Sequence, residues 1–328
     1  MGSPSADRAS GSARVPTFRE VVLERTLFYA INQKDRSVKR GIIAGFMAYT
    51  LWGLLPVYWK SIEAVPALEI LCHRMVWSLV FLLLVLVARG QWAWIQQVRT
   101  TPSILLLHLV SACLLTLNWF IYIWATLSGH IVDASLGYFI TPLFSVVLGV
   151  LFLRERLRPG QRVAIGFAAV GVLVLTLGYG SFPWIALALT LTFGLYGLVR
   201  KVSPLGSLEG LSLETALLVL PALGYLLYVG AGHGGAFGHA GASTTLLLAG
   251  TGPVTAIPLL LFAAAARQVR LATVGILQYI APTFQFLLGV LAYGEPFTPA
   301  RLLGFAPIWL ALAIYSFEGL REERERRS

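Results

Sequence analysis

The sequence predicts an all-α integral membrane protein with about ten transmembrane helices, arranged as two inverted five-helix repeats. Three observations support this prediction. Hydrophobic residues make up 57% of the 328 residues and charged residues only 12%, which is too apolar for a soluble domain of this length. Continuous apolar runs of about 20 residues, each long enough to cross a bilayer as a helix, recur along the chain. One long stretch, residues 132–159, returns in recognisable form at 272–299.

The two copies match at one fixed offset, that from Pro142 to Pro282, which is close to half the length of the chain. Solenoid units repeat at only roughly 20–50 residues, so this is a duplicated half. Chance similarity between two apolar stretches would not also align proline, glycine and glutamate. Duplicated membrane halves are typical of secondary transporters. The matched identities are Ile140 and Ile280, Pro142 and Pro282, Phe144 and Phe284, Leu148 and Leu288, Gly149 and Gly289, Leu151 and Leu291, Glu155 and Glu295, and Pro159 and Pro299.

Each predicted span is near the length that crosses the hydrocarbon core of a bilayer. The spans occupy residues 41–60, 67–88, 103–125, 132–153, 161–178, 182–199, 211–230, 244–265, 272–293 and 300–318. The chain then divides into four parts: an N-terminal extension (1–40), a first five-helix repeat (41–178), a second five-helix repeat (179–318) and a charged cytoplasmic tail (319–328).

The N-terminal extension is expected to be cytoplasmic, disordered in its polar first part and amphipathic further on. Residues 1–14 are small, polar and basic, which favours disorder. Residues 18–31 carry apolar side chains at helical spacing with charges between them, as in a helix on the membrane surface. The segment lacks the apolar core and cleavage site of a signal peptide. The alternative is a dispensable extension.

Basic residues fall in every second connection between the spans, which sets the orientation in the membrane. These connections are expected to be cytoplasmic, so the protein is expected in the inner (plasma) membrane with both termini cytoplasmic. Five helices per half is an odd number, so the two halves insert in opposite senses. The basic residues lie in loops, so the net charge of +10 does not indicate nucleic-acid binding. They include Arg89, Arg99, Arg154, Arg156, Arg158, Arg200, Lys201, Arg267 and Arg270.

Polar and aromatic residues inside the first two spans are candidates for a substrate cavity. Trp52 and Pro56 share a helix face, and the proline frees a backbone carbonyl at membrane depth. Arg74 lies about 10 Å into its span, where a charge is costly. It is either a cation facing an anionic or polar substrate, or a snorkelling or structurally paired arginine. His73 also belongs to the candidate cavity, and Glu69 is spaced to interact with it.

The remaining candidates lie in the third span and in the two matched copies. Asn118 either contacts substrate or bonds a neighbouring helix. Pro142 and Pro282 are predicted kinks at matching positions, which indicates a binding region near the midplane. We expect Tyr138, Gln278 and Tyr279 to line the cavity there. Asp133 and Glu69 are candidates for proton coupling.

Six stretches of the sequence between residues 49 and 283 resemble the RarD branch of the EamA family in the drug/metabolite transporter superfamily. The resemblance runs from about residue 40 to 317 and implies ten helices in two inverted repeats, an inner-membrane location and a central cavity for small molecules. The chain departs from the usual pattern with Asp133 in place of Glu and Thr141 in place of Asn. The stretches are YTLWGLLPVYWK (49–60), EILCHRMVWS (69–78), NWFIYIWA (118–125), DASLGYFITP (133–142), YGLVRK (196–201) and QYIAPT (278–283).

The leading functional hypothesis is a secondary active transporter that exports small polar or amphipathic metabolites or drugs through a central cavity by alternating access. The expected partners are the lipid bilayer, a small-molecule substrate and a proton or ion gradient. No ATP-binding loop, catalytic motif or paired-cysteine motif occurs, so no cofactor, metal or enzymatic activity is expected. The alternatives are a non-transporting interaction or regulatory membrane protein, or a membrane-embedded enzyme. The substrate, the direction of transport, the coupling ion and the oligomeric state are not determined by the sequence.

Overall fold

The protein is all-helical in the residues that the computed structural model describes, which are 18–154, 159–179, 182–232, 234–268 and 277–325. Within these residues nine helices are long and apolar enough to cross a membrane, and Ile280–Ala292 is a shorter apolar helix. The helices in chain order are α1 (Phe18–Lys60), α2 (Ala67–Arg89), α3 (Ala93–Thr100), α4 (Pro102–Leu127), α5 (Ile131–Leu153), α6 (Pro159–Tyr179), α7 (Trp184–Val202), α8 (Ser207–Gly230), α9 (Ala242–Gln268), α11 (Ile280–Leu287), the π-helical η1 (Leu288–Ala292) and α12 (Pro299–Glu325).

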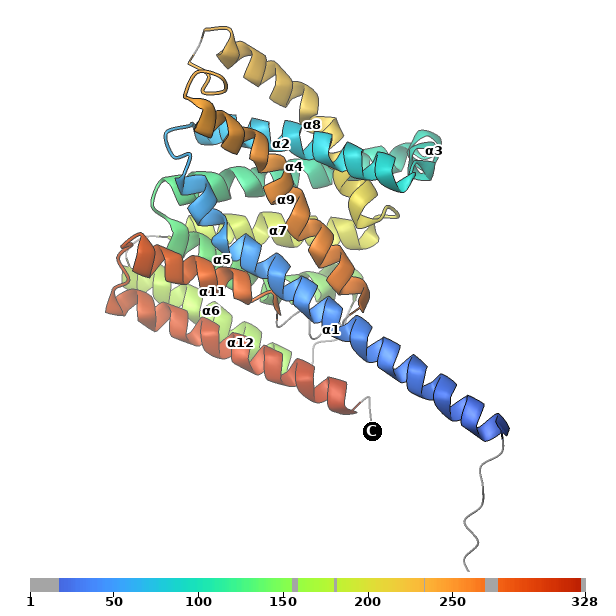
Figure 1. The fold of residues 1–328 in the computed structure, drawn as a ribbon. Coiled ribbons are helices and arrows are strands. Elements are labelled where there is room, and N and C mark those ends of the chain that lie inside the picture. The colour runs from blue at the N-terminus through green and yellow to red at the C-terminus, as the bar shows by residue number, and fades with distance from the viewer. Residues whose placement is uncertain (1–17, 155–158, 180–181, 233, 269–276, 326–328) are drawn as a thin grey trace, which may run out of the picture.

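The structure differs from the sequence-based expectation at three places. Residues 18–31 are helical, but they continue without a break into the first span, and this part of α1 projects beyond the bundle (Figure 1). The short helix α3 was not predicted. α12 continues past its span into the charged tail, because glutamate and arginine are good helix formers outside the membrane. The expected disorder of residues 1–14 and part of the span predicted at 272–293 lie outside the described residues.

α6 and α12 lie side by side and run in opposite directions (Figure 1). Near the start of α6, the Gly160 N–H donates to a carboxylate oxygen of Glu318 near the end of α12, at 3.0 Å. In the middle, a Cβ on Gly171 would lie 2.7 Å from the Gly304 carbonyl oxygen. Glycine therefore allows the two backbones to approach closely, as is common between membrane helices.

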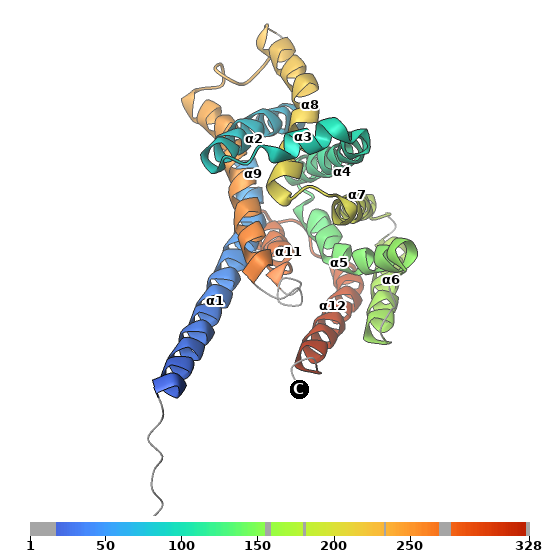
Figure 2. The same cartoon turned by 90° about the vertical axis from the view of Figure 1, so that its right-hand side faces the viewer.

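Two further helix pairs are joined by very similar contacts. α1 packs on α11, where a Cβ on Gly53 would lie 2.6 Å from Phe284. α7 packs on α5, where a Cβ on Gly194 would lie 2.5 Å from the Phe144 ring. In each pair the phenylalanine occupies space that the absent glycine side chain leaves, so a Cβ at either position would force the phenylalanine or its helix to shift. Figure 2 shows α5 and α11 near the centre of the bundle, with α6 and α12 on one flank.

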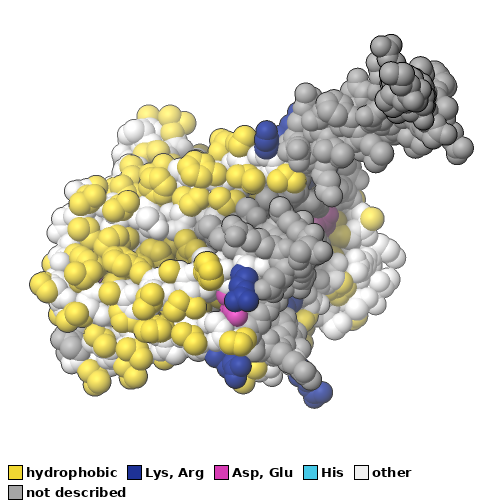
Figure 3. Space-filling view, turned by 90° about the horizontal axis from the view of Figure 1, so that it is seen from below, with side chains coloured by type: hydrophobic (Ala, Val, Ile, Leu, Met, Phe, Trp, Pro, Cys, Tyr) yellow, Lys and Arg dark blue, Asp and Glu magenta, His cyan; other side chains and the backbone are white. Residues whose placement is uncertain are grey.

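The outer surface of the bundle is apolar. Large hydrophobic side chains are exposed on nearly every span, where water would make them unfavourable and lipid would not. Figure 3 shows hydrophobic side chains over most of the coloured part of one face, with Lys and Arg gathered toward one end. This distribution is that of a bundle embedded in a bilayer. The most exposed leucines include Leu84, Leu106, Leu177, Leu220 and Leu246.

Candidate functional site

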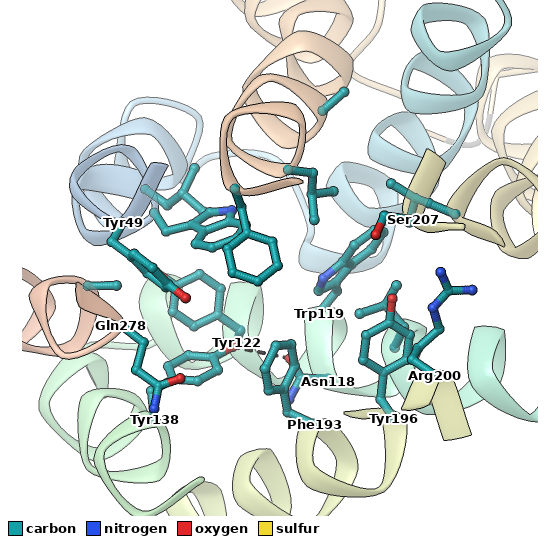
Figure 4. Close-up of a pocket in the computed structure, with 18 of the residues that line it drawn as sticks. Tyr49, Asn118, Trp119, Tyr122, Tyr138, Phe193, Tyr196, Arg200, Ser207 and Gln278 are labelled. Atoms are coloured by element: carbon teal, nitrogen blue, oxygen red, sulfur yellow. Dashed lines mark hydrogen bonds between the residues drawn. The ribbon is translucent and has the colours of Figure 1, made fainter. Parts of the chain in front are cut away.

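A cavity of about 480 Å³ lies inside the bundle, between α1, α2, α4, α5, α7, α8, α9 and α11. Aromatic side chains from several helices point into it (Figure 4). Its volume is in the range of pockets that hold drug-sized molecules. The lining residues include Tyr49, Trp52, Arg74, Arg89, Asn118, Trp119, Tyr122, Tyr138, Thr141, Pro142, Phe193, Tyr196, Arg200, Ser207, Phe262, Gln278, Pro282 and Gln285.

The cavity opens toward the end of the bundle where α2 and α7 finish. Arg89 at the end of α2 and Arg200 near the end of α7 both line it. Arg74 lies about four turns before Arg89 on the same helix, which places it roughly 22 Å deeper at the rise of an α-helix. The cavity therefore extends from a basic mouth well into the depth of the membrane.

Arg74 is buried deep in this cavity without an acidic partner among the described residues. Its side chain is 4% exposed, so it does not snorkel to the surface. The guanidinium carbon lies 3.8 Å from the centre of the Trp119 ring and 5.4 Å from that of Trp59. Cation–π contacts of this kind contribute roughly 0.5–2 kcal/mol each, which offsets part of the ~2.5–3.5 kcal/mol cost of a charge within the bilayer. Its Nε and Nη1 atoms have no hydrogen-bond partner within the described part of the chain.

Asn118 joins the cavity wall to the neighbouring helix. Its amide nitrogen donates to the Leu189 carbonyl oxygen at 3.1 Å and to the Thr192 hydroxyl at 3.0 Å, both on α7. Its amide oxygen accepts from the Tyr138 hydroxyl at 3.2 Å, the dashed contact in Figure 4. The amide therefore bonds α4 to α7 and also orients Tyr138 along the cavity wall.

One side of the cavity is a cluster of aromatic rings. Tyr49 and Trp52, one turn apart on α1, lie 5.3 Å apart between ring centres in an edge-to-face arrangement. Phe262 of α9 lies within 5.9 Å of both rings. Gln278 lies on the wall below Tyr49 in Figure 4. The wall thus combines flat apolar surfaces with a few amide and hydroxyl groups.

Several predicted site residues are not among those that line the cavity. The His73 ring stacks on Phe237 at 4.9 Å, and its Nε2 lies 3.9 Å from Glu69. A carboxylate oxygen of Glu69 accepts from the Ala236 N–H at 2.6 Å. His73 points away because consecutive helix residues lie about 100° apart around the axis, so Arg74 and His73 cannot share a face.

The other predicted residues outside the lining lie in the surrounding core. Tyr279 packs in an apolar cluster with residues of α6 and α12. Pro56 is buried within α1 but does not line the cavity, although its neighbour Leu55 does. Asp133 forms contacts at the closed end of the bundle, described below. By contrast Trp52, Arg74, Asn118, Tyr138, Gln278, Pro142 and Pro282 all line the cavity.

A buried polar cluster beside the mouth was not among the predicted site residues. The Glu214 carboxylate, 2% exposed, lies 3.4 Å from Arg200 Nη1 and accepts from the Ser111 hydroxyl at 2.5 Å. Arg200 Nη1 also donates to His108 Nε2 at 2.9 Å. His108 Nδ1 faces the Ile104 carbonyl oxygen at 3.0 Å, which can only accept, so Nδ1 carries the proton and the ring is neutral. The sequence signal that could have indicated this cluster was the i, i+4 spacing of Tyr196 and Arg200, which places both side chains on one helix face; both line the cavity.

At the end of the bundle opposite the mouth, the start of α5 is bonded to the residues that follow η1. The backbone N–H groups of Ile131 and Val132, at the start of α5, donate to the two carboxylate oxygens of Glu295 at 2.6 and 2.8 Å. Asp133 lies 3.2 Å from His130 and 3.6 Å from Arg301. A carboxylate at a helix N-terminus is stabilised by the unsatisfied N–H groups and by the helix dipole. The helices are therefore bonded together at the end of the bundle opposite the basic mouth.

Apolar helices around a deep cavity with one open end place the protein in the class of multi-pass membrane transporters. A solved crystal structure supports the fold: it matches with a TM-score of 0.56 and covers 85% of this chain and 98% of its own, at 22% identity. At that identity the likeness concerns the fold alone.

Sequence comparison then identifies the family. The model of the EamA-like transporter family matches residues 39–177. The chain is 49% identical to Protein RarD of Streptomyces exfoliatus over 294 residues, which are 90% of this chain and 93% of that protein. It is 46% identical to the uncharacterized transporter YojE of Bacillus subtilis, over 88% of this chain and 98% of that one. The chain belongs to the EamA family, a family of membrane transporters rather than enzymes, as the resemblance in the sequence predicted.

Proposed function

We propose that this chain is a secondary active transporter that exports small polar or amphipathic molecules by alternating access. The observation that carries the proposal is the cavity itself. It reaches from a mouth at Arg89 and Arg200 past Arg74, and we infer that the contacts of Glu295 at the opposite end of the bundle close it there. A cavity that is accessible from one side only is what one half of an alternating-access cycle requires.

We infer that the two states are related by an inverted repeat, residues 41–178 and 179–318. Helices that correspond at the offset of the repeat, such as α6 and α12, pack against each other in opposite directions. Phe144 and Phe284 correspond at this offset, and each packs beside a glycine, Gly194 and Gly53, although these two glycines are one position out of register. Exchange of the halves thus maps the α1–α11 pair onto the α7–α5 pair, which supports a pseudo-two-fold axis in the membrane plane.

The mouth of the cavity is proposed to face the cytoplasm, with both termini on that side of the inner (plasma) membrane. Arg89, Arg99 and Arg200 lie at this end of the bundle, and basic loops stay on the cytoplasmic side. In Figure 1 the projecting part of α1 and the end of α12 lie at the same end. Export would then begin with binding from the cytoplasm in the conformation described.

The energy source is proposed to be a proton or ion gradient. Asp133 is the better placed of the two predicted proton carriers, because its side chain is 24% exposed at the closed end and contacts His130 and Arg301. Glu69 is 1% exposed and bonded to backbone, so its release would require a larger rearrangement. Transport rates that do not change when the pH gradient is collapsed would exclude proton coupling through either residue.

Transport is tested by reconstituting the full chain in liposomes and measuring the flux of a broad metabolite panel. Leu115 lines the cavity, so Leu115→Trp is expected to abolish flux by filling it. Leu106 lies on the same helix and is 66% exposed on the lipid side, so Leu106→Trp is the matched control and should retain flux. The absence of flux for every solute, with the folded wild-type chain, would favour a non-transporting membrane protein instead.

A further inference from the structure

We infer that the substrate is an organic anion: its negatively charged group binds Arg74, and its apolar body lies against the aromatic wall. The inference rests on the proposed function and names the substrate class of the same cavity. Three independent features support it: the free donors of Arg74, the charge of the cavity lining and the aromatic surface around it.

The first feature is that Arg74 is buried and that two of its donor atoms have no hydrogen-bond partner among the described residues. A structural arginine inside a membrane protein normally donates its N–H groups to carboxylates or backbone carbonyls. Here the guanidinium stacks on Trp119 at 3.8 Å, and its Nε and Nη1 atoms bond to nothing within the described residues. Stacking fixes the plane of the guanidinium without using its edges. These two nitrogens are buried as well as unbonded, so a carboxylate or another oxyanion, whose geometry matches the planar fork, reaches them once the neighbouring side chains move aside.

The second feature is the charge of the wall. Three arginines line the cavity, Arg74, Arg89 and Arg200, whereas no Asp or Glu appears among the described lining residues. Arg200 is compensated by Glu214, 3.4 Å away, outside the cavity. Arg74 has no such carboxylate partner within the part of the chain that the structure describes. In a low-dielectric cavity this charge attracts anions and opposes cations over its whole length.

The third feature is the surface next to Arg74. Trp119 and Tyr122, on α4, both line the cavity, and the Tyr122 ring meets Tyr138 edge to face at 5.6 Å. The Tyr122 hydroxyl is buried on this wall beside the Thr126 side chain. A ligand that presents an anionic group at one end and a flat or apolar body behind it would bond to Arg74 and bury its body on the rings.

The test compares carboxylates with their own amides, which have nearly the same shape but no charge. Binding to the full-length protein in lipid nanodiscs is measured by calorimetry for pairs such as indole-3-acetate and indole-3-acetamide, and 3-phenylpropionate and 3-phenylpropionamide. Carboxylates should bind about tenfold or more tightly than their amides, as expected for charge-assisted bonds. Arg74→Gln should remove the preference and Arg74→Lys should retain part of it. Arg99→Gln, an exposed arginine on α3, should leave the preference unchanged.

The wild-type comparison does not depend on the folding of any variant. The inference is overturned if no carboxylate binds better than its amide, or if the preference survives in folded Arg74→Gln. Flux reports on the proposed function separately. Transport of neutral or cationic solutes without a carboxylate preference would reject the anion and retain the transporter. A carboxylate preference lost in Arg74→Gln, without flux of any solute, would retain the anion site and reject transport.

Discussion

Replacing Glu295 with glutamine should shift the protein from the conformation described toward one that is open at the opposite end. The carboxylate accepts the N–H groups of Ile131 and Val132 with separate oxygens, at 2.6 and 2.8 Å. Glutamine keeps one acceptor oxygen but turns an NH₂ group toward the second N–H, so one bond is lost. It also removes the charge from the N-terminus of α5.

The size of the effect follows from these contacts. A hydrogen bond to a charged group contributes about 1.5–3 kcal/mol, and a charge at a helix N-terminus typically adds roughly 0.3–1 kcal/mol. The loss is therefore about 2–4 kcal/mol. If the contact exists only while this end is closed, the equilibrium between the two conformations shifts by roughly 30- to 1,000-fold.

A cysteine in the cavity reports the shift. The chain has only two cysteines, Cys72 and Cys113, so both can be replaced by alanine. Thr141 lines the cavity and is 7% exposed, and Thr141→Cys supplies the reporter. An impermeant maleimide added outside intact cells should label this cysteine faster in Glu295→Gln than in the parent.

The matched control removes a carboxylate at the same end of the bundle. Glu63 is exposed and pairs with Lys60 of its own segment at 3.3 Å, so Glu63→Gln should leave labelling unchanged. The reasoning is refuted if labelling of Thr141→Cys stays at the parental rate while Glu295→Gln lowers the melting temperature. In that case the carboxylate stabilises α5 in both conformations and does not act as part of a gate.

Two further predictions concern stability in detergent. A Cβ on Gly252 would overlap the Trp77 carbonyl oxygen, so Gly252→Ala must separate α9 from α2, at a cost of about 1–3 kcal/mol. The melting temperature of Gly252→Ala should therefore fall. Gly166→Ala is the control, because open space surrounds its Cβ, and its melting temperature should not fall. Glu214→Gln should lower the melting temperature by the equivalent of about 2–3 kcal/mol, somewhat less than the ~3–5 kcal/mol of a fully buried pair, because the side chain of Arg200 is 15% exposed and keeps other acceptors. An unchanged melting temperature in either variant would contradict the packing or the ion pair described.

The sequence predicted the helices better than the orientation of their side chains. Long apolar runs locate spans because lipid requires every backbone group to be bonded within the segment. The same runs carry little information on which face points inward, because lipid and the protein core are both apolar. Hence Arg74 was placed with His73, although only Arg74 lines the cavity. Asn118 was left between substrate contact and helix contact, and its amide bonds to α7 are consistent with the second role.

Contacts between distant segments were harder still to predict. Arg200 and Glu214 are close in sequence, but their pairing depends on how α7 turns into α8. Glu295 was noted as a matched identity, yet its bond joins the end of the second copy to the start of α5 in the first half of the chain. Whether the predicted residues contact substrate stays a prediction.

The unpaired charge of Arg74 can be traced to one position of the proposed repeat. The offset that relates Pro142 to Pro282 also relates Lys60 to Arg200 and Arg74 to Glu214, so the two pairs occupy matching places in the proposed repeats. In the second half the pair is a cation and an anion, and they bond to each other at 3.4 Å. In the first half both residues are cations and cannot pair. Lys60 instead lies 3.3 Å from Glu63, and Arg74 lines the cavity without a counter-ion among the described residues. In the proposed repeats one reversed charge therefore makes the site asymmetric, and on the inference drawn above the substrate supplies the anion that completes it.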